Sequence, residues 1–552
     1  MSQTTTAARP DTDAPTSMTH RQVLEALSGL MLGMLVAILS STVVSTSLPK
    51  IIADLGGTQS SYTWVVTSTL LATTVSTPLW GKFADLFNRK LLLQLSLVVF
   101  VVGSALAGLS TSSGMLIGFR VVQGLGAGGL TALSTVVMAD IISPRERGRY
   151  MGYLGAVMAV GTLGGPLLGG VLTDTVGWRW NFYVGVPIAA VAIIVLQKTL
   201  HLPALKRRAV SIDYLGAALI SGSVSLLLIW VTLGGQQFTW GSWQTVAMVG
   251  GAVLMGALLL VVELRATEPI LPLSLFHNRT VVLAVVASVA VGVAMYGTTV
   301  FLSQYMQLAR GKTPTESGLL TMPLIVGVLL SSTIAGQLIS RTGVWKRYVV
   351  SGGVLLVIGM ALMGTVRYDT SWTALSAYMF VMGVGVGMVM QNLVLVVQNV
   401  LPIRQMGVGT AAVAFFRSLG GAVGVSAMGA ILASRVLTLM LDGLAKLHIP
   451  TSAMRSTTTV PDLSTLPRPI RLVVEAAYGE AVGDIFLAAI PVAIIALVAV
   501  AFLPNARLGT RSGAELLLEE TEAAAGLSPI AAESDDELAL AAHQRTVELE
   551  KA

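Results

Sequence analysis

The chain has 552 residues, of which 54% are hydrophobic and only 11% are charged, and its formal net charge is +6. Soluble domains carry about 25% charged residues, so a chain this poor in charge is predicted to lie mostly in lipid. It contains no cysteine, which excludes disulfides, thiolate metal sites and cysteine nucleophiles.

Fourteen segments are long and apolar enough to be membrane helices, because a helix needs about 20 mostly apolar residues to cross the bilayer. In chain order they are 23–47, 62–80, 91–109, 115–139, 150–172, 180–199, 213–233, 244–264, 281–308, 318–339, 348–366, 372–400, 407–434 and 485–503. The sequence therefore predicts an all-α membrane protein with fourteen transmembrane helices. The polar residues 1–22 are expected to form a disordered N-terminal tail.

The charges of the loops predict the orientation of these helices. An even number of spans places both termini on one side of the membrane. If that side is the cytoplasm, the short inner loops carry 15 Lys and Arg residues and the short outer loops carry five. Because positive charge gathers in cytoplasmic loops, both termini are predicted to be cytoplasmic, including the acidic tail 505–552. The long loop 435–484 is then external, where it either covers the outer mouth or is a variable surface excursion.

The glycines indicate an internal repeat. Residues 124–170 hold twelve glycines, and adding 259 to their numbers lands on glycine seven times, as in the pair Gly161 and Gly420. Such repeats are common in membrane transporters, whose facing bundles leave a midplane cavity. The repeat predicts six-helix bundles at 23–199 and 281–503, with a two-helix hairpin inserted at 213–264. Small residues also allow close helix packing in lipid, so packing alone could explain these glycines.

Three stretches resemble motifs of the major facilitator superfamily. "GKFADLFNRK" at 81–90 resembles its loop 2–3 signature, with Asn88 where glycine is usual, and "RVVQGLGAGG" at 120–129 is similar to its fourth-helix motif. "GYLGAVMAVGTLGGPLLGG" fits the fifth-helix antiporter motif at six positions: Gly152, Gly161, Gly165, Pro166, Gly169 and Gly170. With fourteen spans, the chain resembles the 14-helix drug:proton antiporters, which are multidrug efflux transporters. The resemblance covers about residues 22–505.

The resemblance implies a charge cluster on the inner side that holds the halves together when the cavity faces outward. Asp85, Arg89 and Asp140 would form this latch. The alternative is ordinary orienting charge with no gating role. That alternative explains Asp85 poorly, because acidic residues contribute little to orientation.

Arg120 is a charged residue inside an apolar span, where it costs about 2.5–3.5 kcal/mol on insertion scales. The resemblance places it on the cavity, together with Gln123 of the same motif. The alternative is that its side chain reaches the polar headgroups of the outer boundary. A second arginine, Arg417, lies near the middle of the span 407–434.

The acidic partner that the family usually provides is absent. The antiporters carry an aspartate in the first span in a pattern like L-D-x-T-I-V-N-x-A-L-P, and Ser40 stands at that position in "LSSTVVSTSLP". No Asp or Glu lies in the interior of any predicted span. We therefore expect the cavity to suit neutral, zwitterionic or anionic compounds better than organic cations.

Other polar and aromatic residues of the spans could line the cavity. This expectation covers Trp64, Gln304, Tyr305, Gln391 and Asn392. Each could instead make ordinary polar contacts between helices.

An intramembrane enzyme is one rival interpretation, but all five histidines lie outside the spans and no HExxH motif occurs. A receptor that transports nothing is a second rival, although it would leave the antiporter motif without a role.

The sequence therefore predicts no catalytic residue, metal site or cofactor. It predicts a monomeric exporter of drugs, antibiotics or small amphipathic metabolites in a bacterial cytoplasmic membrane, driven by the proton gradient, with no nucleic-acid partner. The alternative is an exporter of an anionic natural product or lipid, coupled through peripheral acids or uncoupled.

Overall fold

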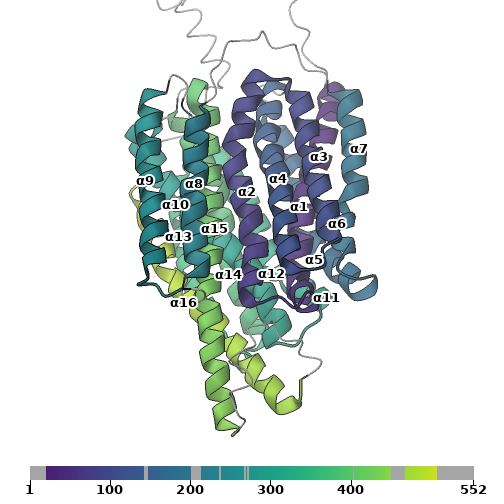
Figure 1. Cartoon of the computed structure of the whole chain (residues 1–552). Helices are drawn as coiled ribbons and strands as arrows, with labels where there is room; N and C mark the ends of the chain where they lie inside the picture. The colour runs from purple at the N-terminus through teal and green to yellow at the C-terminus, as the bar shows by residue number, and fades with distance from the viewer. Residues whose placement is uncertain are drawn as a thin grey trace, which may run out of the picture.

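The computed structural model of the chain describes residues 20–141, 147–200, 213–234, 238–266, 269, 273–401, 403–448 and 466–505. Over these ranges the chain folds into a bundle of helices without a β-strand, as Figure 1 shows. The predictions for the N-terminal tail and for the acidic C-terminal tail fall on residues that lie almost entirely outside these ranges.

We group the helices by the predicted division into a first half, a hairpin and a second half. The first half contains α1 (His20–Asp54), α2 (Gln59–Leu86), α3 (Arg89–Gly108), α4 (Ser113–Ile141), α5 (Arg147–Thr175), α6 (Trp180–Tyr183) and α7 (Gly185–Thr199). The hairpin is α8 (Tyr214–Leu233) and α9 (Trp243–Arg265). The second half contains η1 (Leu273–His277), α10 (Arg279–Gln304), the π-helical turn η2 (Tyr305–Ala309), α11 (Pro314–Leu320), α12 (Met322–Thr342), α13 (Lys346–Gly364), α14 (Trp372–Val400), α15 (Ile403–Lys446) and α16 (Arg468–Ala501).

Twelve helical segments in the described part of the chain are long and apolar enough to cross a membrane. They coincide with twelve of the fourteen predicted spans, and α2 and α5 coincide with the other two. The all-helical membrane fold is therefore confirmed, while the number of fourteen crossings stays a prediction.

Two predicted spans are interrupted, and proline accounts for both breaks. Proline has no N–H and cannot donate the helical hydrogen bond to the carbonyl four residues earlier. Pro187 lies just after the break between α6 and α7, and Pro323 lies just after the break between α11 and α12.

The predicted external loop 435–484 needs correction, because α15 continues to Lys446 and α16 already begins at Arg468. Arg435 of α15 pairs with Asp484 of α16 at 2.7 Å and with Glu480 at 3.8 Å. The two helices project from one end of the bundle in Figure 1. Hydropathy detects only the apolar part of a helix, so it missed these charged extensions.

The glycine repeat has a structural counterpart in the two halves. A Cβ atom on Gly126 of α4 would meet the backbone of Phe100 on α3, and one on Gly385 of α14 would meet the backbone of Leu356 on α13. Each glycine thus lets its helix touch the equivalent neighbour in its own half. The backbone approach leaves no room for a side chain at either position.

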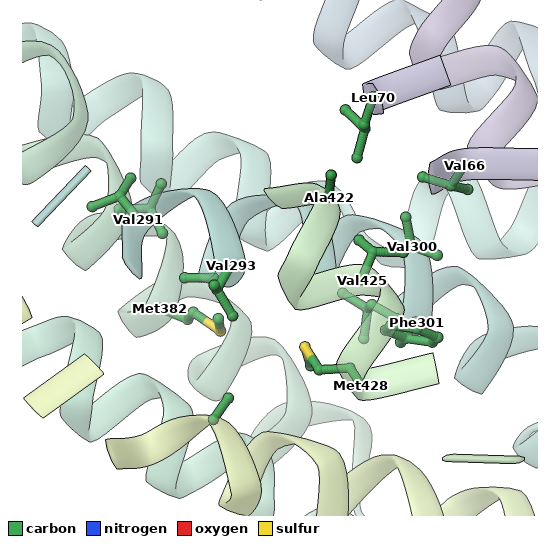
Figure 2. Packing of buried hydrophobic residues seen from close by; sticks show 14 of the residues in the cluster. Val66, Leu70, Val291, Val293, Val300, Phe301, Met382, Ala422, Val425 and Met428 are labelled. Carbon is green, nitrogen blue, oxygen red and sulfur yellow. The ribbon is translucent and has the colours of Figure 1, made fainter. Parts of the chain in front are cut away.

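The apolar core divides into two clusters that differ in how far they reach. One cluster contains only residues of the first half, among them Leu30, Leu93 and Leu196. The other joins residues of both halves. In Figure 2, Val66 and Leu70 of α2 face α15 and α10 across this shared cluster. All the first-half members of the shared cluster lie toward the end of the bundle where α1 stops and α2 starts.

The inserted hairpin covers the seam between the halves. Helix α8 packs against both α2 and α15, and its residues Ile220, Val224 and Leu228 belong to the shared cluster. Helix α9 exposes many large apolar side chains, among them Trp243 at its start. Such a surface is expected to face lipid.

We predict that Gly126→Val destabilises the protein by about 1–3 kcal/mol, the usual cost of overpacking a tight contact. Gly118→Val on the same helix is the matched control, because no atom lies within 4 Å of a Cβ at that position. Thermal unfolding of the purified variants measures the difference. Equal melting temperatures for the two variants would contradict the contact described here.

Candidate transport site between the two halves

The halves are joined by hydrogen bonds that cross between them at one end of the bundle. Gln304 of α10 donates through Nε2 to Oε1 of Gln59 on α2 at 2.6 Å, and Gln59 donates back at 3.3 Å. Both side chains are buried. This reciprocal amide pair satisfies a donor and an acceptor on each side, which a buried amide requires.

Further hydrogen bonds surround the amide pair. Tyr62 donates to the Val300 carbonyl at 2.9 Å, and Gln307 donates to the Thr46 carbonyl at 2.6 Å. The hydroxyls of Thr67 and Ser426 lie 3.0 Å apart. We call the following residues the inter-half junction: Thr46, Gln59, Tyr62, Thr67 and Asp174 in the first half, with Val300, Ser303, Gln304, Gln307, Thr315 and Ser426 in the second.

One carboxylate takes part in the junction. Asp174 at the end of α5 accepts hydrogen bonds from the backbone N–H of Thr315, at 3.1 Å, and from the Thr315 hydroxyl. Thr315 lies in the first turn of α11, where backbone N–H groups lack helical partners. The carboxylate of one half thus caps a helix of the other.

The glycines of the antiporter motif on α5 contact helices of both halves. A Cβ on Gly161, Gly165 or Gly169 would collide with α1, and Thr42 of α1 donates to the Gly161 carbonyl at 3.1 Å. Gly170 instead lies against the backbone of Thr315 in the second half. Helix α5 is therefore wedged between α1 of its own half and α11 of the other.

Two further contacts complete this arrangement. A Cβ on Gly318 of α11 would lie 2.5 Å from the Pro166 carbonyl oxygen. At a second contact between the halves, Gly429 of α15 lies against the side chain of Thr63 on α2. Gly170 and Gly429 are partners in the 259-residue repeat, so each half presents an equivalent glycine to the other.

Arg120 is held by neutral groups. Its Nε donates to the Val65 carbonyl of α2 at 3.3 Å, and its Nη1 donates to Oε1 of Gln123 at 2.6 Å. Only 5% of Arg120 and 1% of Gln123 are exposed. Arg120 therefore does not reach out along the surface in this structure, and it forms no ion pair with a described residue.

Ser40 and Arg417 form no hydrogen bond with Arg120 or Gln123. Ser40 is buried, its hydroxyl has no hydrogen-bond partner among the described residues, and it faces Gly185 of α7. Arg417 is half-buried on α15, where its carbonyl touches Gly292 of α10. It also forms no ion pair with a described side chain.

The remaining predicted lining residues have different surroundings. Gln304 belongs to the inter-half junction, whereas Tyr305 is buried in its own half and donates to the Arg367 carbonyl at 2.7 Å. Asn392 is buried and donates to the Met388 carbonyl of its own helix at 2.6 Å. Trp64 is half-buried, and the side chain of Gln391 lies outside the described residues.

The predicted latch is only partly visible. Arg89 donates through Nε to the Ala84 carbonyl at 3.0 Å, which ties the start of α3 to the end of α2. The side chains of Asp85 and Asp140, and the surroundings of Gly152, lie outside the described residues. Asn88, the departure from the family pattern, caps α3 by accepting from the backbone N–H of Lys90 and Leu91.

Sequence reasoning missed most of the junction. Gln59, Tyr62, Asp174 and Ser426 were not singled out, because a polar residue near a helix end has many possible partners. A usable signal did exist in the repeat. Gly170 and Gly429 are equivalent positions, and both lie at the contact between the halves.

Comparison with known proteins identifies the family. The Major Facilitator Superfamily profile matches residues 30–425. The chain belongs to the major facilitator superfamily. It is 37% identical over 472 residues to an uncharacterized MFS-type transporter of Mycobacterium tuberculosis, covering 85% of this chain and 68% of the relative. It is 33% identical over 419 residues to the multidrug transporter protein MdtP of Bacillus subtilis, covering 76% and 77% of the two chains.

A solved transporter structure shares the fold. A bacterial homolog of the human lysosomal transporter Spinster, in an inward-facing and unoccupied conformation, superposes with a TM-score of 0.60 at 14% identity, over 90% of this chain and all of the other. The predicted family membership is confirmed, and the chain is a multi-pass membrane transporter of the superfamily.

We predict that a disulfide between Thr67→Cys and Ser426→Cys stops transport, because it links α2 to α15 across the junction. The hydroxyls are 3.0 Å apart, and the native chain has no cysteine to interfere. Transport of a fluorescent substrate should stop on oxidation and return on reduction. Either single variant should be unaffected by oxidant. Full transport by the oxidised, cross-linked double variant would contradict a moving junction.

We predict that Gly165→Leu abolishes transport, because its side chain would collide with Thr42 where α5 contacts α1. Gly164→Leu on the neighbouring position is the control, since a Cβ there meets nothing within 4 Å. Flux should be lost in the first variant and kept in the second at equal expression. Equal flux in both would show that the close contact has no role in transport.

Proposed function

We propose that this transporter exports drugs or small amphipathic metabolites across a bacterial cytoplasmic membrane by alternating access, driven by the proton gradient. One observation carries the proposal. The two halves share an apolar core and a set of hydrogen bonds at one end of the bundle, with the antiporter-motif helix α5 in the contact. In the orientation predicted from the loop charges, that end is the outer one.

The junction is suited to repeated opening. Apart from the bonds to Asp174, its hydrogen bonds join neutral groups, and each is worth about 0.5–1.5 kcal/mol net. A substrate shifts the balance of two conformations only by its difference in affinity for them. Because the junction consists of several weak bonds, the two conformations differ little in free energy, and binding of a small molecule can shift the equilibrium between them.

The direction and breadth of transport rest on relatives. MdtP is named a multidrug transporter, and a second Bacillus subtilis relative, 30% identical over 403 residues, is named multidrug resistance protein 3. The fifth-helix motif is typical of antiporters in this superfamily. These likenesses support export of varied compounds in exchange for protons.

An exporter of an anionic natural product or lipid is the second candidate. It is favoured by Arg120 and Arg417, which form no ion pair within the described part of the chain. In that case coupling would run through peripheral acids, or transport would be uncoupled.

Flux in proteoliposomes tests the proposal. With the lumen acidified relative to the medium, protein inserted with its cytoplasmic side outward should drive uptake of a fluorescent amphipathic compound. A protonophore should stop this uptake. The oxidised Thr67→Cys/Ser426→Cys variant is the inactive control. Equal uptake with and without the pH gradient would contradict proton coupling. Absence of all uptake would contradict the proposal that the protein is an exporter.

A further inference from the structure

Two side chains of α4 form a fixed hydrogen-bonding unit in the first half. Arg120 and Gln123 are three residues apart, which places them on the same face of the helix. The bond from Arg120 Nη1 to Gln123 Oε1 is short, at 2.6 Å, and the Val65 carbonyl holds Arg120 Nε from α2. The guanidinium is therefore fixed from two sides rather than free to rotate.

The orientation of the Gln123 amide follows from this bond. Turning the amide over would place its NH₂ against a guanidinium N–H, and two donors cannot satisfy each other. The oxygen of Gln123 must therefore face Arg120, which leaves Nε2 as the group without a partner. The Nε2 atom is buried and has no hydrogen-bond acceptor among the described residues.

The unit consequently offers donors and lacks acceptors. Arg120 Nη2 makes no hydrogen bond to a described residue, and Gln123 Nε2 makes none either. A buried donor without an acceptor is costly, and a buried positive charge without a counter-charge more so. Both deficits would be met by one ligand that carries a negative charge and oxygen acceptors.

No carboxylate of the described chain supplies that charge. Ser40 stands where the related antiporters carry an aspartate, and it faces Gly185. Asp174, the carboxylate of the junction, is engaged with Thr315. The counter-charge for Arg120 would therefore have to come from a bound molecule.

We propose that Arg120 and Gln123 form a recognition site for an anionic oxygen group, a carboxylate or sulfonate, on the exported compound. Arg120 supplies the charge, and Gln123 positions the guanidinium and supplies a second donor. The inference rests on the proposed export function and assigns its substrate class. It requires the ligand to reach the α2–α4 contact, where both side chains are buried in the present conformation.

An isosteric substitution tests this directly. Gln123→Glu replaces the unpartnered donor with a carboxylate oxygen next to Arg120, so the chain itself would supply the missing counter-charge. The binding of carboxyfluorescein and of rhodamine 6G to the purified full chain is measured by fluorescence anisotropy. The wild-type protein should bind the anionic dye. The variant should bind it about 10- to 100-fold more weakly, the scale of a lost charge-assisted hydrogen bond.

The cationic dye and further variants separate a specific effect from misfolding. Gln123→Glu should leave rhodamine 6G binding unchanged or strengthen it. Arg120→Gln should lose the anionic dye in the same way, whereas Arg120→Lys should keep part of the affinity, because it retains the charge without the planar fork. Gln94→Glu, the same change on a half-buried amide of α3 that pairs with Gln197, should alter neither dye.

Three results would overturn the proposal: equal loss of both dyes in Gln123→Glu, no loss of the anionic dye in that variant, or displacement of carboxyfluorescein by chloride alone. The proposed function fails separately, if dyes bind but the wild-type protein moves none of them in proteoliposomes. Active export with a dye preference that Arg120 and Gln123 variants do not change would sink only this inference.

Discussion

Close contact between helices at a few glycines is the constraint on which the rest of this structure depends. Gly126 and Gly385 bring helix backbones together within each half. Between the halves, Gly170 lies against the backbone of Thr315 and Gly429 lies against the side chain of Thr63. In lipid, helices gain little from the hydrophobic effect, so close packing and hydrogen bonds supply the association. Gly170 and Gly429 leave room for the close approach of the halves at which the hydrogen bonds of the inter-half junction form.

The same constraint explains how one end can be joined while the halves remain separate bodies. The apolar cluster that contains Leu30, Leu93 and Leu196 is confined to the first half, whereas the cluster around Val66 is shared. A rigid half that is attached at one end can rock about that attachment. Helix α5, held by α1 on one side and α11 on the other, is placed to transmit such a movement.

The sequence predicted the all-helical membrane fold because long apolar runs are a strong signal for membrane helices. The division into two halves, indicated by glycines that recur after 259 residues, stays a prediction. The charged ends of α15 and α16 escaped because hydropathy does not detect a helix outside the lipid. Arg120 and Gln123 were predictable neighbours from their spacing, but the Val65 carbonyl was not, since backbone acceptors carry no sequence signal. Gln304 was expected to line a cavity, and only the fold shows that it meets Gln59.

We infer that the halves move as bodies about the inter-half junction, and distances across the bundle test this movement most directly. The cysteine-free chain allows two pairs of spin labels, one at Asp54 and Tyr368 near the junction and one at Phe87 and Arg341 at the opposite end. All four side chains are exposed. During transport in liposomes, the first distance should lengthen as the second shortens. If both distances stay constant during transport, or both change in the same direction, the halves do not rock about this junction.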